Sequence, residues 1–448
     1  MTTNAETNPA HPGHPAKHLP PQPVVSARRT ILGTGVGNAI EWYDWAIYAT
    51  FAPFFAGQLF NNEDPASAVL ATLAIFAVGF LARPLGGFVF GWLGDRIGRK
   101  YSMTLAVALA SVGSLLIGIA PTYAAMGALA SVTLLVARLI QGLAHGGELP
   151  SSQTYLSEMA PKEKRGFWAT LIYTSGTVGT LFGILLGAVL TLVLSSEQML
   201  AWGWRIPFLL GAALGLYGLV MRTRMKETDL FEQETTQEKR EPMWPQIIRY
   251  RKQALQVIGL TVGLTVVYYT WGIVAPTYAS TSLGMDRGAA LWSGVIANIV
   301  FLIALPIWGK VSDKIGRKPV LWISSIGAAT MHFPMTWLLQ DSPWQLVVSM
   351  SVMLIFIAAS AAIVPAVYAE LFPTSIRTIG VGVPYSICVA LFGGTAPYLN
   401  SWLTANAGPN AFAFYTVTLL LVSVAFIFTI PETKGKDLRE EPVAVPAR

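Results

Sequence analysis

Twelve runs of apolar residues, each long enough to cross a lipid bilayer, recur along the 448-residue chain. They lie near 31–56, 66–94, 101–120, 124–150, 167–194, 202–222, 254–279, 288–312, 317–339, 344–369, 376–403 and 410–430. The bilayer core is about 30 Å thick and takes roughly 20 helical residues to cross, so each run predicts one transmembrane helix. Only 12% of the residues are charged, against about 25% in soluble proteins. This composition excludes a soluble protein.

The distribution of basic residues predicts the orientation. Placing the N-terminus in the cytoplasm puts 26 of the 30 Lys and Arg on the cytoplasmic side, as cytoplasmic loops require. We therefore expect an integral protein of the bacterial cytoplasmic membrane with both termini inside. The exceptions are Arg83, Arg138, Arg205 and Arg287. The last two fall at the outer ends of the sixth and eighth predicted spans, so Arg83 and Arg138 are the cations expected within the membrane. Because the other basic residues are scattered over short loops, nucleic-acid binding is not expected.

Two motifs occur once in each half of the chain. The pattern Gly-x-x-x-Asp-(Arg/Lys)-Ile-Gly-Arg-Lys is found at 91–100 and at 309–318, and Glu-x-x-Pro-x-x-x-Arg is found at 158–165 and at 370–377. Such parallel repeats predict an all-α membrane protein with two six-helix bundles and a binding site between them near the midplane. The expected divisions are a tail (1–29), a first bundle (30–222), a cytoplasmic linker (223–252), a second bundle (253–431) and a tail (432–448).

The paired loop motifs, together with Arg-x-x-Gln-Gly at 138–142, resemble the major facilitator superfamily. A narrower resemblance, to the metabolite:proton symporter family, comes from Gly-Asn-x-x-Glu-Trp-Tyr-Asp at 37–44, Arg-Pro-x-Gly-Gly at 83–87, Gly-Gly-Glu at 146–148 and Trp-Arg-Ile-Pro-Phe at 204–208. Members of that family take up alpha-ketoglutarate, citrate, shikimate, or proline and betaine. The resemblance thus implies proton-driven import by alternating access and leaves the substrate open.

Charged side chains inside a membrane are costly and usually functional. Glu41 and Asp44 are three residues apart and share one helix face, while Arg138, His145 and Glu148 belong to a polar stripe on the fourth span. These five residues are the predicted proton-coupling set, with Asp44 as the titrating group and Arg138 as its partner in one state. The alternatives are that an acid only neutralises a buried arginine, that His145 only binds a neighbour, and that Glu148 locks the cytoplasmic side.

Arg83 lies twelve residues before Asp95, about 18 Å along a helix, which places it near the middle of the membrane. Since a guanidinium binds a carboxylate through two hydrogen bonds, we expect Arg83 to bind a small carboxylate-bearing substrate. The alternative is an internal ion pair with Glu41 or Glu148. The remaining predicted substrate contacts are polar and aromatic residues within the spans: Tyr48, Gln141, Tyr268, Tyr269, Trp271, Asn298, Tyr368 and Tyr385. The absence of deep cations in the second half favours a mono- or dicarboxylate, or a zwitterion, over a tricarboxylate.

The repeated loops predict a cytoplasmic gate. Asp95 and Asp313 are expected to accept hydrogen bonds from the first amides of a facing helix, and nearby basic residues are expected to bridge to acids. The predicted gate residues are Asp95, Arg96, Arg99, Glu158, Asp313, Lys314, Arg317 and Glu370.

Other classes of function fit less well. A proton-coupled exporter of cations is disfavoured by Arg83 and Arg138, and an uncoupled facilitator stays open. Nothing in the sequence indicates an enzyme or a sensor, because no nucleophile motif, phosphate loop or metal-ligand set is present. The single cysteine, Cys388, excludes disulfides. We expect a monomer whose partners are substrate, protons and lipid, with no cofactor and no metal.

Overall fold

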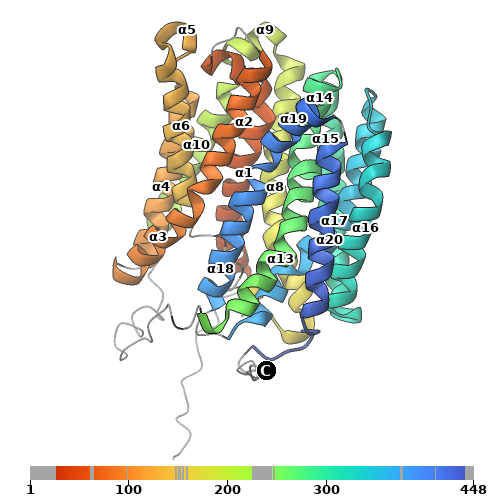
Figure 1. Ribbon diagram of the computed structural model, residues 1–448. Helices are drawn as coiled ribbons and strands as arrows, with labels where there is room; N and C mark the ends of the chain where they lie inside the picture. Colours follow the sequence, from red (N-terminus) through yellow and green to blue (C-terminus); the bar gives the residue numbers. More distant parts are fainter. Residues whose placement is uncertain are drawn as a thin grey trace, which may run out of the picture.

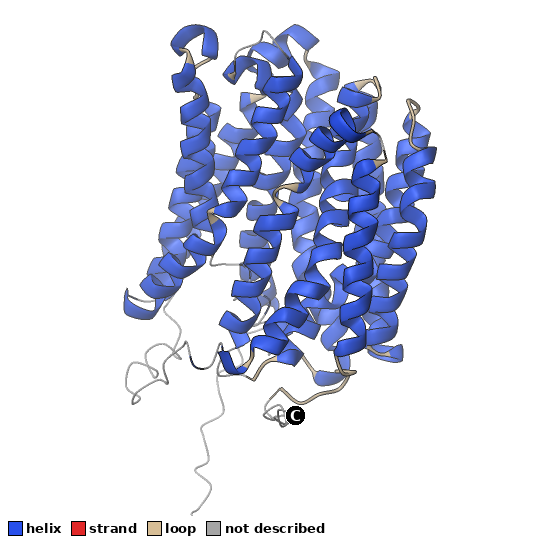
Figure 2. Ribbon diagram, viewed as in Figure 1, coloured by secondary structure: helices blue, strands red, loops and turns tan. Residues whose placement is uncertain are grey.

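The computed structural model describes residues 27–60, 65–97, 99–146, 149, 153, 156–157, 160–223, 245, 248–373, 377–408 and 410–438. The side chains of 27–34, 65–67, 91–103, 221–223 and 378 are not described. Helices joined by short loops make up this part of the chain, with no strand among the described residues (Figure 2). Most of the long helices run between the two ends of one elongated bundle (Figure 1).

The first half contains the elements from α1 to α10. Their bounds are α1 (Ala27–Leu59), α2 (Pro65–Leu81), α3 (Arg83–Ile97), α4 (Arg99–Gly118), α5 (Tyr123–Met126), α6 (Ala128–His145), η1 (Lys162–Lys164), α8 (Arg165–Val193), α9 (Ser196–Gln198), η2 (Met199–Gly203) and α10 (Arg205–Thr223). The second half contains α13 (Arg251–Tyr268), η3 (Tyr269–Val274), α14 (Ala275–Ser282), α15 (Arg287–Ile315), α16 (Arg317–Leu338), α17 (Pro343–Leu371), α18 (Arg377–Cys388), η5 (Val389–Gly393), α19 (Ala396–Ala407) and α20 (Ala411–Thr429).

Each of the twelve predicted spans coincides with one helix or with consecutive helices. Among the described residues, eight helices are long and apolar enough to cross a membrane on their own, and the bent pair Ser196–Gly203 and Arg205–Val220 makes a possible ninth. The other predicted spans fall on α1, α4 and α16, whose described helices are shorter or more polar.

Glycines allow the helices of the first half to approach closely. A Cβ atom on Gly179 of α8 would lie 1.9 Å from the carbonyl oxygen of Ala39 in α1, and one on Gly142 of α6 would lie 1.9 Å from that of Gly79 in α2. Small residues at such positions let membrane helices pack backbone to backbone. The positions of α2 and α6 against α1 place the polar residues of these helices next to one another.

The two halves meet along their whole length. Helix α8 of the first half packs against α15 of the second, and toward the C-terminal end of α8 this contact buries Ile184 and Ala188 against Leu291 and Val295. On the other side of the bundle, α2 and α3 contact η5, α18 and α19. Between these two seams, α1 contacts η3, and the candidate site lies at this contact.

Candidate functional site

Glu41 and Arg83 form a buried ion pair at the middle of the bundle. Nη2 of Arg83 lies 2.5 Å from Oε1 of Glu41, and the two residues are 7% and 2% exposed. Arg83 is the first residue of α3, directly after the break that ends α2 at Leu81. The break precedes Pro84, which has no backbone N–H to continue the hydrogen bonding of α2. The pairing corresponds to the alternative sequence interpretation of Arg83, an internal ion pair.

Asp44 lies three residues after Glu41 but faces different helices. Its Oδ1 accepts a hydrogen bond from Ser114 of α4 at 3.0 Å, and its Oδ2 lies 3.8 Å from Nε2 of His145 in α6. Ser114 in turn accepts from Gln141 at 2.8 Å. The two acids, three residues apart on α1, therefore have separate partners. Asp44 belongs to a polar network inside the first half.

Arg138 belongs to the same network. It donates to Gln141 at 2.8 Å, three residues along the same helix, and does not pair with Asp44 in this conformation. Its guanidinium carbon lies 4.1 Å from the ring centre of Trp45 and 4.3 Å from that of Tyr48. The Tyr48 hydroxyl donates to the carbonyl of Thr72 at 2.9 Å. Tyr48 and Gln141 therefore support Arg138 within the first half, although we predicted that they contact substrate.

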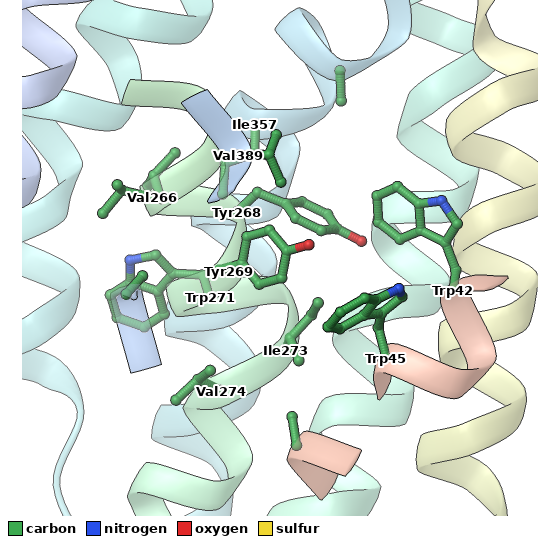
Figure 3. Close-up of a cluster of buried hydrophobic side chains, with 14 of the residues drawn as sticks. Trp42, Trp45, Val266, Tyr268, Tyr269, Trp271, Ile273, Val274, Ile357 and Val389 are labelled. Carbon is green, nitrogen blue, oxygen red and sulfur yellow. The ribbon is translucent and has the colours of Figure 1, made fainter. Parts of the chain in front are cut away.

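The second half faces the Glu41–Arg83 pair with phenol groups. Tyr269 of η3 and Tyr385 of α18 both interact electrostatically with Glu41 and Arg83. The ring of Tyr268 packs edge-on against Trp42 at 5.5 Å. Figure 3 shows the hydroxyl groups of Tyr268 and Tyr269 directed toward Trp42 and Trp45 of α1. The pair is thus enclosed between charges of the first half and hydroxyl-bearing rings of the second.

Three predicted substrate contacts lie elsewhere in the second half. Trp271 points away from α1 (Figure 3) and donates to Nδ1 of His332 at 3.3 Å, beside a small cavity of about 40 Å³ within that half. Asn298 donates to the carbonyl of Gly272 at 3.2 Å and so supports η3. Tyr368 shares a 2.7 Å hydrogen bond with Thr261. These residues have protein partners that account for their position.

Four aromatic residues at the site were missed by the sequence analysis. Trp45 and Phe80 lie beneath the guanidinium of Arg83, with ring centres 4.5 and 4.7 Å from its central carbon. Trp42 and Tyr173 pack edge-on at 5.6 Å, and Tyr173 interacts with Tyr385 across the two halves. Trp42 and Trp45 flank the acids of the quoted motif at 37–44, and this proximity was the available signal.

Predicted gate residues join the halves at the lower end of Figure 1. Oδ1 and Oδ2 of Asp313 accept hydrogen bonds, each at 2.9 Å, from the backbone N–H groups of Gly166 and Phe167, in the first turn of α8. The predicted contact between this acid and the first amides of a facing helix is therefore present. Glu370 lies 2.9 Å from Arg165 and 3.4 Å from Arg317. Arg165 was not among the predicted gate residues, although the repeated motif contains it.

The segment after α20 reinforces this lower-end junction. Thr433 donates to Glu370 at 2.5 Å, and Arg165 of the first half donates to the carbonyl of Lys436 at 3.0 Å. Glu432 accepts from the backbone N–H groups of Arg317 and Lys318 at the start of α16. Burial would by itself raise the pKa of Glu432, but backbone hydrogen bonds favour its carboxylate and lower that pKa below its usual value.

The side chains of Asp95, Arg96 and Arg99, and the residues Glu148 and Glu158, lie outside the described part of the chain. Lys314 contributes its backbone carbonyl, which accepts from Lys434 at 2.7 Å. Within the described residues, no group of three or more His, Cys, Asp or Glu side chains is arranged to hold a metal ion.

Comparison with known proteins places this architecture in a family. The model of the family described as "Sugar (and other) transporter" matches residues 31–241 and 224–444. The alpha-ketoglutarate permease of Escherichia coli (strain K12) is 35% identical over 411 residues, covering 91% of this chain and 94% of the permease. A putative proline/betaine transporter of Staphylococcus haemolyticus is 33% identical, covering 92% of this chain and 90% of that protein.

The solved structures agree on the fold. The crystal structure of a D-xylose-proton symporter superposes with a TM-score of 0.73 at 21% identity, covering 92% of this chain and all of that one. The predictions of a transporter rather than an enzyme and of two repeated helical halves are thereby confirmed. The chain belongs to the sugar (and other) transporter family.

Proposed function

We propose that the protein imports a small carboxylate-bearing metabolite together with protons, by alternating access across the bacterial cytoplasmic membrane. It acts as a monomer with both termini in the cytoplasm. The observation that carries the proposal is the buried Glu41–Arg83 pair between the halves, next to a second buried acid, Asp44, with His145 3.8 Å away. An anion site beside groups that take up protons is what anion:proton symport requires.

In this proposal Arg83 exchanges one carboxylate for another. With no substrate bound, Glu41 neutralises Arg83; a substrate carboxylate takes the place of Glu41, because a guanidinium binds both groups through the same hydrogen bonds. Glu41 then loses its ion pair with Arg83, and the loss of a nearby cation favours the protonated form of a buried acid. Asp44 and His145 serve as the proton site of the first half.

The lower-end junction closes the cytoplasmic side in this proposal. Opening it requires Glu370 to leave Arg165 and requires Asp313 to leave the first turn of α8, so its bonds hold the conformation described here. The names of the relatives support two substrate classes, a dicarboxylate such as alpha-ketoglutarate and a zwitterion such as proline or betaine. Both carry the carboxylate that Arg83 binds.

Uptake by purified protein in proteoliposomes tests the proposal. Labelled alpha-ketoglutarate, succinate, proline and betaine are offered with an inward proton gradient, with no gradient, and with a gradient collapsed by a protonophore. We expect at least one of them to accumulate above the external concentration only with the intact gradient, and its unlabelled amide not to compete. If every compound merely equilibrates, or none enters, proton-driven carboxylate import is wrong for this chain.

A further inference from the structure

Trp45 touches both cationic centres of the first half. The ring centre of its indole lies 4.5 Å from the guanidinium carbon of Arg83 and 4.1 Å from that of Arg138. The two guanidinium carbons are therefore no farther apart than the sum of these distances. Arg83 belongs to the ion pair with Glu41, whereas Arg138 belongs to the hydrogen-bond network of Asp44. A single ring is thus common to both groups.

The surroundings hold the indole in place. Trp45 is 3% exposed. The centre of its ring lies 3.9 Å from the ring centre of Phe80 and 6.0 Å from that of His145. Gly79 leaves room for the edge of the indole, since a Cβ atom at Gly79 would lie 3.3 Å from it. A ring packed on several sides cannot follow one cation without disturbing the other. Its position is therefore sensitive to both groups.

The buried donors around Trp45 are incompletely used. Within the described residues, Nε1 of Trp45, Nε of Arg83, and Nε and Nη2 of Arg138 are buried and have no hydrogen-bond partner. Unsatisfied buried donors are costly and rare. The ring face supplies the attraction that hydrogen bonds do not supply here, because a guanidinium is drawn to an aromatic face. Arg83 and Arg138 are of like charge and compete for this stabilisation.

We infer that Trp45 is a positioning residue that couples the substrate-side pair Glu41–Arg83 to the proton-side network of Arg138. The inference rests on the proposed function. When a carboxylate draws Arg83 off the ring, the indole face attracts Arg138 alone, and the resulting change in Arg138 alters the electrostatic field at Asp44. By thermodynamic reciprocity, a proton at Asp44 then changes the affinity of the substrate site by the same factor.

The test replaces the ring in the full-length protein and separates coupling from folding. Trp45→Leu removes the aromatic face and Trp45→Phe keeps a smaller one. The matched control is Trp204→Leu: Trp204 is also buried with an unpartnered Nε1, and the guanidinium carbon of Arg205 lies 4.3 Å from its ring centre. The probe is whichever of alpha-ketoglutarate, succinate, proline and betaine the wild type accumulates, and its affinity is measured across pH 5–8 together with counterflow and proton-driven accumulation.

We expect the wild type and Trp204→Leu to show the same pH dependence of affinity. In Trp45→Leu this dependence should shrink by about tenfold, with counterflow retained and accumulation reduced to the external concentration; Trp45→Phe should lie between. Equal weakening of binding by Trp45→Leu at every pH, or unchanged coupling, would overturn the inference. So would loss of folding in Trp45→Leu combined with wild-type pH dependence in Trp45→Phe. If the wild type transports none of the probes, the proposed function fails instead.

Discussion

The two halves of the bundle divide polar chemistry unequally. The first half buries Glu41, Asp44, Arg83, Arg138 and His145 within its helices. In the described part of the second half, Arg317, Glu370 and Arg377 are buried at or next to helix ends, and His332 is buried within α16 beside Trp271. The face of this half toward the Glu41–Arg83 pair presents phenol rings. Inserting a charged side chain into a membrane costs about 2.5 to 3.5 kcal/mol on insertion scales, so buried charges are expected where they have a function. The first half therefore provides the charged side chains of the candidate site, and the second half lines that site with uncharged aromatic rings.

The largest expected effect is at Asp44. Asp44→Asn removes the acid that we propose takes up the transported proton, but it keeps the side-chain volume and the contact with Ser114. Proton-driven accumulation should be abolished, while counterflow, which requires no net proton transfer, should stay measurable. The control is Asp286→Asn, which changes an acid at the start of α15 that bonds only to the local backbone N–H of Ala289. If a well-folded Asp44→Asn protein loses counterflow as well as accumulation, then Asp44 acts in substrate binding or in the structure rather than in proton coupling.

Arg83→Lys should have the next largest effect. It keeps the charge but not the two parallel hydrogen bonds, so affinity for the substrate carboxylate should fall by the value of a charged hydrogen bond, about 1.5 to 3 kcal/mol, or roughly ten- to a hundredfold. Binding to purified protein measures this change. Arg205→Lys, at the start of α10 where Arg205 donates to the carbonyls of Gly118 and Ala120, should leave affinity unchanged. Equal affinity in Arg83→Lys would leave Arg83 as a structural partner of Glu41.

Removing a phenol hydroxyl group of the second half should have a smaller effect on substrate affinity. Tyr385→Phe and Tyr269→Phe each remove one neutral hydroxyl near the Glu41–Arg83 pair, so affinity should fall about two- to tenfold with coupling intact. Transport kinetics at two pH values separate these effects, and Tyr217→Phe, which changes a residue exposed on α10, is the control. A loss of coupling in either variant would break the proposed division between the halves.

The smallest effect is expected at the lower-end junction. Glu432→Gln should lower the free energy of unfolding by about 1 kcal/mol, as loss of a helix N-cap does, without changing coupling. Because the folded-state pKa of Glu432 lies below the usual value of 4.5, its stabilisation is present above pH 4.5 and is lost as the pH falls through the folded-state pKa. Thermal unfolding of both proteins should differ at pH 7 and converge in acid. If the two proteins differ in thermal unfolding by the same amount at every pH, the charge of Glu432 does not contribute to stability.

Hydropathy predicted the spans well because crossing a bilayer sets the length of an apolar run. The repeated motifs likewise predicted the contact of Asp313 with α8. The partner of Arg83 was not settled, since Glu41 and a substrate carboxylate satisfy a guanidinium equally well. Trp45 and Tyr173 escaped notice because an aromatic residue in an apolar span resembles ordinary packing. Only the folded structure, which brings Arg83 of α3 and Arg138 of α6 to Trp45 of α1, shows that one indole contacts two arginines.

The most direct test of proton-coupled import is the internal pH of sealed proteoliposomes that hold a pH-sensitive dye. Substrate, identified from the labelled panel, is added outside without any imposed gradient. The account predicts acidification of the interior in step with substrate uptake in the wild type, and uptake without acidification in Asp44→Asn vesicles under the same substrate gradient. Wild-type uptake with no pH change, or with a rise in internal pH, would contradict the proposal that the charges of the first half couple carboxylate entry to proton entry.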